Sequence, residues 1–459
     1  MNKRALYILL LIVTVTLNSC HIYKKYEFPS NENTITEDYS RIISEEPDSA
    51  SLAYLGWEEI FTDPILQGYI KQAIENNKDL DDARRNVEIA QAQLKGAKLS
   101  YLPALSLNPN GGSASYGGSH MNWTYTIPLA ASWEIDAFGK ILNKKRGAKV
   151  SVEQMEAYEQ AVRSQIICGV ANTYYALVLL NQQLNLTKYT SEIWQDQVES
   201  MKLLKEAAYV NEAAVVQSSA NYWSIKSSIP DIQQAIVETS NTMSLLLNTY
   251  PQEWEVTNDL EFSLPVDISN GVPVSYLAVR PDVKAAERGL AAAYYNTNSA
   301  RASFYPSFTI SAQGGFTNLV GSIVTNPGKW FIQLAGQLAI PLFSRGQNIA
   351  TLEAAKSRQR QAMNSFEKTV LNASAEVSDA LAKIANNGEK RIYLEQQIKN
   401  LEKSVEYTQE LLTLDPKTTY LEVLTARSSL LNAQLSSLAS WHTQVSALIS
   451  LYQAVGGGR

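Results

Sequence analysis

One pattern of residues occurs twice in this chain, and this repetition constrains the fold more than any other feature. The two copies span residues 78–105 and 281–308, and matching positions differ by 203. In each copy an alanine-rich stretch of helical character leads to a proline and then to alternating β-type sequence. A period this long excludes a solenoid, whose repeats recur every ~20–50 residues. We therefore expect an internal duplication of one helix–hairpin–helix unit and a pseudo-symmetric molecule.

The N-terminal residues predict an export signal. Two basic residues precede the apolar run 5–17, which is shorter than the ~20 residues of a membrane-spanning helix. The run ends in Leu-Asn-Ser-Cys at 17–20, which is typical of a lipoprotein cleavage site, although Asn18 is less usual there. An ordinary signal peptide is the alternative. In the lipoprotein interpretation residues 1–19 are removed, and Cys20 carries acyl chains such as palmitate that anchor the chain in a membrane.

Charge and chemically reactive residues exclude several function classes. The net charge is −6 without a long basic block, which argues against nucleic acid as a partner. Besides Cys20 there is one further cysteine, Cys168, which lies in an apolar helical context and is expected to be a small core residue. The three histidines, His21, His120 and His442, are scattered. We therefore expect no catalytic residues, no metal site and no cofactor beyond the covalent lipid.

Four stretches alternate apolar and polar residues with period two. The clearest are 123–135 and 330–340, and their partners begin near Leu105 and Phe308. Each has room for the ~9–11 residues that cross a bilayer, with one face suited to lipid and the other to water. A layer of a soluble β-sandwich is the alternative interpretation.

The number of strands bears on the oligomeric state. Counted as two separate hairpins, the four strands leave four open edges, and unpaired backbone groups in lipid cost several kcal/mol each. Four strands also cannot close a barrel, for which about eight are needed. If the strands span a membrane, the barrel must be shared between subunits.

The remaining sequence predicts unusually long helices. The segment 148–208 contains no proline and one glycine, and a continuous helix there would be ~90 Å long. Pro230 is expected to end or kink the following helix, and 415–419 marks the turn before the last one. His442 is expected to pack in the seam of that last helix. The seam follows spacings of three and four residues through Leu421, Leu424, Ser428, Leu431, Leu435, Leu438, His442, Val445, Ile449 and Tyr452.

These patterns divide the chain into segments. We predict a lipoprotein signal peptide (1–19), a lipid-anchored N-terminal segment (20–60), helices of the first repeat (61–103 and 139–250) around a first transmembrane hairpin (104–138), a connector (251–274), helices of the second repeat (275–304 and 344–455) around a second hairpin (305–343), and a C-terminal tail (456–459).

Seven short motifs, in this order and at these spacings, give the chain a family resemblance. They are YEFP at 26–29, WEIDAFGK at 133–140, RPDV at 280–283, PLFSRG at 341–346, YLEVL at 420–424, NAQ at 432–434 and LYQAVGGG at 451–458. With them the chain resembles the outer-membrane factor (TolC-like) family of efflux and secretion channels, particularly its lipoprotein branch. The resemblance covers nearly the whole chain after Cys20.

The resemblance implies an α+β membrane protein that acts as a homotrimer in the cell outer membrane. Each subunit would give four strands to a twelve-stranded β-barrel, continued by a long α-helical coiled-coil barrel in the periplasm. It implies a passive exit duct of a tripartite efflux pump, opened by a periplasmic adaptor protein that links it to an inner-membrane pump. A duct for type I protein secretion and a structural coiled-coil lipoprotein without a pore are the alternatives.

The resemblance also places a gate at the periplasmic helix turns. Leu421 and Leu424 are candidate plugs, and Asp415 and Glu422 are candidate ring charges. Thr425 stands where the family often has an aspartate, so the charge at this depth differs from the usual pattern. The opposing turn at 209–212 lacks the usual glycine.

Overall fold

The computed structural model describes residues 23–30, 32–44, 52–114, 122–258, 260, 262–265, 274–319, 328–343, 345–414 and 420–458. The predicted signal peptide, Cys20 and Asp415 lie outside these residues. The chain divides into two compact units. Unit 1 comprises Met1–Glu37, Arg85–Ala157 and Lys284–Lys368, and unit 2 comprises Asp38–Arg84, Tyr158–Val283 and Thr369–Arg459.

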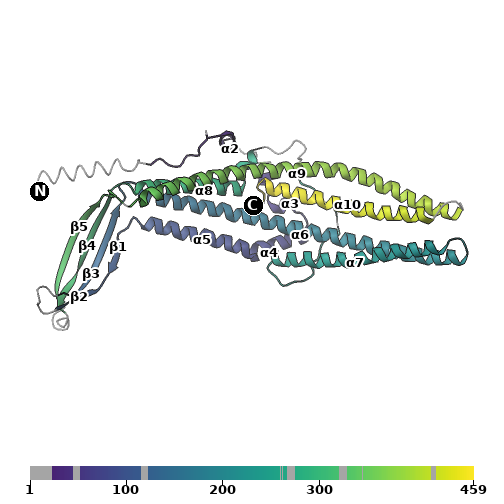
Figure 1. Ribbon diagram of the computed structural model, residues 1–459, viewed down its shortest axis with the longest axis horizontal. Coiled ribbons are helices and arrows are strands. Elements are labelled where there is room, and N and C mark those ends of the chain that lie inside the picture. The colour runs from purple at the N-terminus through teal and green to yellow at the C-terminus, as the bar shows by residue number, and fades with distance from the viewer. Residues whose placement is uncertain are drawn as a thin grey trace. The chain divides into compact units, whose positions relative to one another are not determined.

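Unit 1 contains one antiparallel sheet (Figure 1). Its strands are β1 (Ala104–Leu107), β2 (Asn110–Ala114), β3 (Asn122–Ile135), β4 (Ser307–Leu319) and β5 (Lys329–Ala339). Both β1 and β2 pair with β3 in one register, since Ala104 lies opposite Ser132 and Asn110 opposite Thr126. The interruption falls at Pro109, which has no backbone N–H to give to the ladder. The first predicted strand is therefore one strand broken by a proline.

The two hairpins join edge to edge through β3 and β4. Their ladder runs from Thr124 opposite Leu319 to Ile135 opposite Phe308. A Cβ at Gly315 would lie 2.1 Å from the backbone oxygen of Ile127, so this close pairing requires glycine. The expectation of four open edges was wrong, because the β3–β4 ladder satisfies two of them. The described sheet has two edges, formed by β1 with β2 and by β5.

The helices of the two halves of the chain match in length. They are α2 (Thr34–Ser44), α3 (Trp57–Ile60), α4 (Pro64–Asn76), α5 (Lys78–Leu99), α6 (Lys140–Glu206), α7 (Glu212–Leu246), α8 (Pro281–Ala302), α9 (Gln347–Leu414) and α10 (Tyr420–Ala454), with 3-10 turns at Leu52–Tyr54 and Val274–Ala278. Helices α5 and α8 have 22 residues each, α6 and α9 have 67 and 68, and α7 and α10 have 35 each. The bounds of α5 and α8 differ by the 203 positions seen in the sequence.

No helix among the described residues combines the length and the apolar character that a membrane span requires.

In unit 2, long helices lie side by side, α6 with α7 and α9 with α10 (Figure 1). Side chains join the second pair, because Arg391 donates to Gln444 at 2.8 Å and Ser440 to Asn387 at 3.3 Å. Cys168 is buried in this unit, as predicted, and burial raises the pKa of its thiol to about 12.

The predicted seam of α10 is correct over most of its length. Leu424, Leu431 and Val445 are buried and His442 is half-buried, whereas Leu421 and Ser428 are exposed. At the start of the helix Tyr420 and Val423 are buried instead of Leu421. The difference arises because 3.6 residues per turn let a straight stripe drift away from a strict heptad count.

Helix α7 runs through Pro230 without ending there. Of the two outcomes expected at Pro230, an end or a kink, the end is therefore wrong. A proline removes one i to i−4 hydrogen bond. Pro230 and Lys226, whose carbonyl loses its partner, are both exposed, so water can satisfy that carbonyl.

The C-terminal glycines are docked in unit 2. The N–H of Gly458 donates to the Tyr452 hydroxyl at 2.9 Å, and Arg280 donates to the Ala454 carbonyl at 2.8 Å. A Cβ at Gly457 would lie 2.3 Å from the ring of Tyr452. The tail therefore requires glycine in order to pack against this ring.

Candidate functional site

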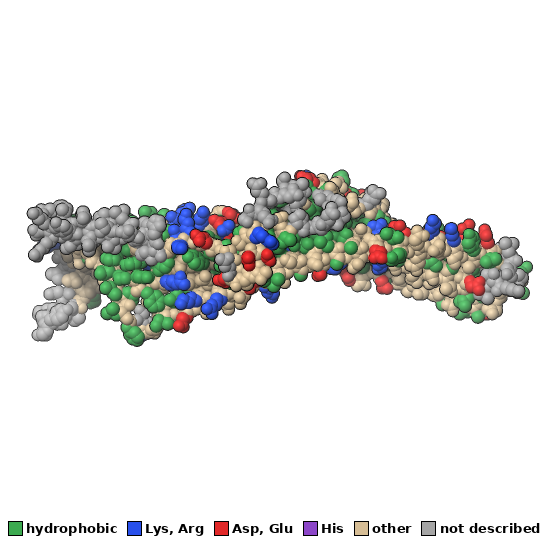
Figure 2. Space-filling view, turned by 90° about the horizontal axis from the view of Figure 1, so that it is seen from above, with side chains coloured by type: hydrophobic (Ala, Val, Ile, Leu, Met, Phe, Trp, Pro, Cys, Tyr) green, Lys and Arg blue, Asp and Glu red, His purple; other side chains and the backbone are tan. Residues whose placement is uncertain are grey.

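One face of the sheet in unit 1 is apolar and exposed. Rows of apolar side chains cross the strands in register, for example Ile127, Phe316 and Trp330. The side chains of Trp330 and Leu334 are 72% and 77% exposed. Figure 2 shows the hydrophobic side chains gathered over this surface. The exposed members are Leu105, Leu107, Trp123, Ile127, Leu129, Trp133, Phe308, Ile310, Phe316, Trp330, Ile332, Leu334 and Leu338. The predicted alternation is confirmed.

The opposite face of the sheet is polar. Gln313 donates to Gln333 at 2.7 Å, and the hydroxyls of Thr126 and Thr317 lie 3.2 Å apart. These pairs join neighbouring strands. The sheet thus has one apolar face and one polar face.

The WEIDAFGK motif forms the turn from β3 into α6. The Asp136 carboxylate accepts from the N–H groups of Ile141 at 3.0 Å and Leu142 at 2.6 Å, which are otherwise unpaired at the start of a helix. Gly139 adopts φ +70°, and Lys140 forms an ion pair with Glu134 at 3.1 Å. The motif therefore fixes how this helix leaves the sheet.

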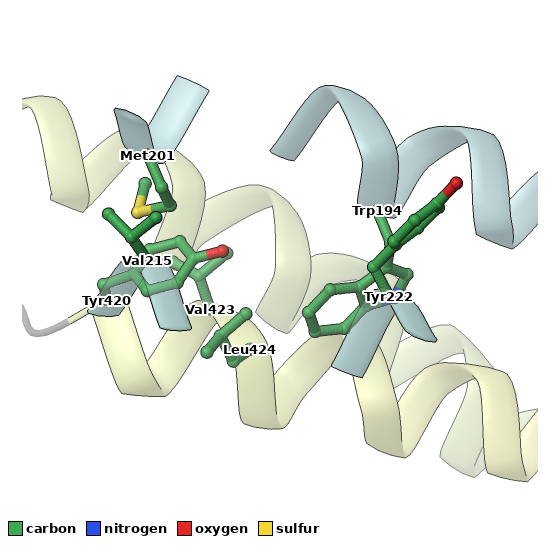
Figure 3. Close-up of a cluster of buried hydrophobic side chains, with 7 residues drawn as sticks. All are labelled: Trp194, Met201, Val215, Tyr222, Tyr420, Val423 and Leu424. Carbon is green, nitrogen blue, oxygen red and sulfur yellow. The ribbon is translucent and has the colours of Figure 1, made fainter. Parts of the chain in front are cut away.

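A buried cluster joins three helices of unit 2 near the start of α10 (Figure 3). We call it the turn cluster, and its members are Trp194, Met201, Val215, Tyr222, Tyr420, Val423 and Leu424. The Ser218 hydroxyl donates to that of Tyr420 at 3.0 Å. Burial raises the pKa of Tyr420, so this phenol stays neutral at physiological pH. The cluster ties the first turn of α10 to α6 and α7.

The structure separates the predicted gate residues. Leu424 is 3% exposed inside the turn cluster, whereas Leu421 is 64% exposed. Glu422 and Thr425 are exposed too, and the Thr425 hydroxyl donates to the Leu421 carbonyl of its own helix at 2.8 Å. Asp415 lies outside the described residues. Tyr420 was not predicted to be buried, because the predicted seam began at Leu421, one residue later. The signal was present in the sequence, since Tyr420 is the first residue of the YLEVL motif.

The turn between α6 and α7 takes its shape without glycine. Ala208 occupies the left-handed position at φ 63°, and the N–H of Tyr209 donates to the Leu204 carbonyl at 2.9 Å. Asn211 then caps α7 by accepting from the N–H of Ala214 at 3.1 Å. An ion pair between Lys205 and Glu212 links the two helix ends.

Across the described ranges, no three or more His, Cys, Asp or Glu side chains are grouped so that they could hold a metal ion.

Comparison with known proteins finds similarity to outer-membrane efflux proteins. The family model described as outer membrane efflux protein matches residues 69–249 and 272–457. The cation efflux system protein CusC of Escherichia coli O6:H1 is 29% identical over 414 residues, which cover 88% of each chain. The probable outer membrane lipoprotein SilC of Salmonella typhimurium is 28% identical over 418 residues, again 88% of each.

Solved structures agree with this fold. A structure of CusC superposes with a TM-score of 0.83 at 26% identity and covers 95% of this chain and 98% of that one. The open state of the MtrE channel of Neisseria gonorrhoeae gives a TM-score of 0.81 at 24% identity over 95% and 97% of the chains, which shows the fold alone.

Proposed function

Because this chain belongs to the outer membrane efflux protein family, we propose that three copies form the passive outer-membrane exit duct of a tripartite efflux pump. The observation that carries this proposal is the sheet of unit 1. It has one exposed apolar face, one polar face and two edges that no described strand covers.

A shared barrel accounts for these edges. In lipid every backbone N–H and C=O must be paired within the protein, so an open sheet edge is excluded. Joining β5 of one copy to the first strand of the next satisfies both edges. Three copies supply twelve strands, which exceeds the ~8 needed to close a barrel. The polar pairs then face the lumen, and the long helices continue the wall as a coiled-coil barrel.

The matching bounds of α5 with α8 and of α7 with α10 support an internal duplication of one helix–hairpin–helix unit. Two such units in each of three copies place six similar helix–hairpin–helix units around one axis. Because the six units are nearly equal, the wall of the duct is round and continuous.

We further propose that the mature chain begins at Cys20 and is held in the outer membrane by its lipid as well as by the barrel. Acyl chains on Cys20 would add ~0.8 kcal/mol for each buried methylene. The protein needs no other cofactor in this proposal.

The periplasmic gate lies at the first turn of α10. The exposed side chains of Leu421, Glu422 and Thr425 are available to neighbouring copies. Asp415 precedes them in the sequence and is the second candidate for a ring of charge. Leu424 packs inside its own copy, so in this proposal it sets the helix spacing and does not plug the lumen. A periplasmic adaptor that loosens the helix contacts would switch the gate between two states.

The cargo class is proposed from the relatives. Their names mention cations, toluene, solvents and antibiotics. These small molecules differ widely while the duct stays similar, so the pump selects the cargo and the duct passes small toxic molecules. Type I secretion of polypeptides is the second candidate, and a structural coiled-coil lipoprotein without a pore is the third.

Single-channel recording of the detergent-purified protein in a planar bilayer tests the duct. We expect discrete conductance steps from a trimer. A monomer that gives no steps would contradict the proposal and favour the structural lipoprotein. Mass spectrometry of proteins that co-purify would then separate an efflux pump from a type I exporter.

The gate is tested with Glu422→Lys, which places three positive charges at one depth of the duct. We expect cation selectivity to fall. The control is Glu253→Lys, the same charge change at an exposed position between α7 and the second repeat. Equal selectivity in both variants and the wild type would show that Glu422 does not face the lumen.

A further inference from the structure

Charge is segregated between the two units. Unit 1 contains 21 Lys and Arg against 11 Asp and Glu, whereas unit 2 contains 18 against 34. The overall charge of −6 therefore hides a strongly basic part of the chain. This part is the one that contains the apolar sheet.

Seven of these 21 basic residues lie where the chain passes between sheet and helices. Every one of the four crossings has at least one, at the end of α5, the start of α6, the end of α8 and the start of α9. Figure 2 shows Lys and Arg side chains directly beside the apolar surface of the sheet. We call this set the cationic belt, and its members are Lys95, Lys98, Lys140, Lys144, Lys145, Arg301 and Arg345.

Nearby carboxylates leave most of the belt uncompensated. Glu134 pairs with Lys140, and Asp136 is used as the cap of α6. In the part of the chain that the structure describes, Lys95, Lys98 and Lys144 form no ion pair and all three are exposed. The belt therefore offers positive charge to a partner outside the chain.

Aromatic rings lie at the same level as the belt. The Lys145 ammonium lies 5.5 Å from the ring centroid of Tyr101, whose carbonyl accepts from the Trp133 indole at 2.9 Å. Phe138 stacks on Tyr305 at 5.0 Å between centroids. Such rings favour the headgroup level of a bilayer, where one end is apolar and the other is wet.

We propose that the cationic belt binds the phosphate groups of anionic phospholipids in the membrane leaflet that faces the helices. The inference rests on the proposed function, because it needs the sheet to lie in a bilayer. Basic residues directly beside a hydrophobic span attract anionic headgroups by Coulomb forces. A nucleic acid or an acidic protein fits less well, since either would leave the adjoining apolar face in water.

The test measures lipid selectivity directly. Wild-type protein is reconstituted into phosphatidylcholine bilayers that contain either spin-labelled phosphatidylglycerol or spin-labelled phosphatidylcholine. Electron paramagnetic resonance then gives the motionally restricted fraction of each. We expect wild type to hold phosphatidylglycerol about fivefold more strongly than phosphatidylcholine, and we expect 1 M NaCl to reduce this ratio toward one.

Two triple variants locate the preference. Lys95→Gln, Lys98→Gln and Lys144→Gln together remove three exposed charges from the belt, and the ratio should fall to less than twofold. Lys188→Gln, Lys202→Gln and Lys399→Gln remove three exposed lysines from the helices of unit 2. This control should keep the wild-type ratio, because those lysines lie outside the unit that contains the sheet.

The outcomes separate this inference from the proposed function. Restricted phosphatidylcholine without any preference for phosphatidylglycerol would overturn the belt and leave the membrane-spanning sheet intact. A preference that survives in the belt variant would overturn the assignment to these lysines. Absence of any restricted lipid would overturn the membrane-spanning sheet, and with it the belt.

Discussion

Units 1 and 2 each take segments from both halves of the chain, but they place their apolar side chains in opposite ways. In unit 1 Leu334 is 77% exposed on the sheet, whereas in unit 2 Leu424 is 3% exposed in the turn cluster. Unit 1 is basic and unit 2 is acidic. The difference teaches that one chain can carry two kinds of surface, and in the proposed function each surface matches its own medium, lipid for the sheet and water for the helices.

The forces that hold the units differ accordingly. The sheet of unit 1 depends on backbone ladders, which a lipid environment would strengthen because water could not compete there for the hydrogen bonds. The helices of unit 2 depend on buried apolar contacts, which stabilise a fold where water is the solvent. The same mutation should therefore have different effects in the two units.

The largest expected effect comes from one substitution made in both units. Leu424→Ala should lower the free energy of unfolding by about 2–5 kcal/mol, because it leaves a cavity in the turn cluster. Leu334→Ala should cost less than about 1 kcal/mol in detergent or lipid, where its surroundings are apolar with or without folding. Denaturant melts followed by helical circular dichroism measure both. Similar losses would show that the two side chains meet the same environment.

A smaller effect concerns the turns that each unit uses. Unit 1 places Gly139 at φ +70°, whereas unit 2 places Ala208 at φ 63°. Ala208→Gly should therefore stabilise the protein by about 0.5–1 kcal/mol, because glycine adopts this conformation without strain. Thermal unfolding measures the change.

The control for this turn is Ala207→Gly, at a neighbour that is also exposed and has no positive φ. It should destabilise the protein by about 0.5–1 kcal/mol. If both glycines act in the same direction, the left-handed turn at Ala208 does not exist in solution.

The smallest effect is a pH dependence of α10. Burial lowers the pKa of His442 below its ordinary value of 6.5, so the folded state favours the neutral ring. The stability that this group contributes is complete above pH 6.5 and is lost as the pH falls toward the folded-state pKa. Between pH 7.5 and 5.5, His442→Gln should lose less stability than wild type. Hydrogen exchange of α10 amides at the two pH values measures this, and equal losses would contradict the burial of His442.

Some features could be predicted from the sequence because they depend on local periodicity. The alternation of Trp123 through Ile135 predicted one apolar strand face, and a proline-free stretch predicted the long helix α6. The matching copies predicted that α5 and α8 would have equal lengths. These properties depend on residues that are close together in the chain, so the local sequence is enough to predict them.

Other features depended on residues far apart in the chain. The pairing of Ile127 with Phe316 joins the two hairpins, and nothing within either hairpin specifies it. The choice between Tyr420 and Leu421 as the buried residue depends on how Ser218 and Val215 of α7 meet the start of α10. Tyrosine and leucine can both pack in a helix seam, so the sequence does not show which of these two adjacent residues is buried. Only the side chains packed against them decide it.

The sequence by itself thus determined the repeat, the strand faces, the helix lengths and the charge of each segment. Tertiary structure alone decided that the hairpins form one sheet with two edges, that Leu424 is internal, and that the basic residues of four separate crossings gather beside one apolar face. The physical reason is that periodicity sets which side of an element is apolar, whereas long-range packing decides what that side meets.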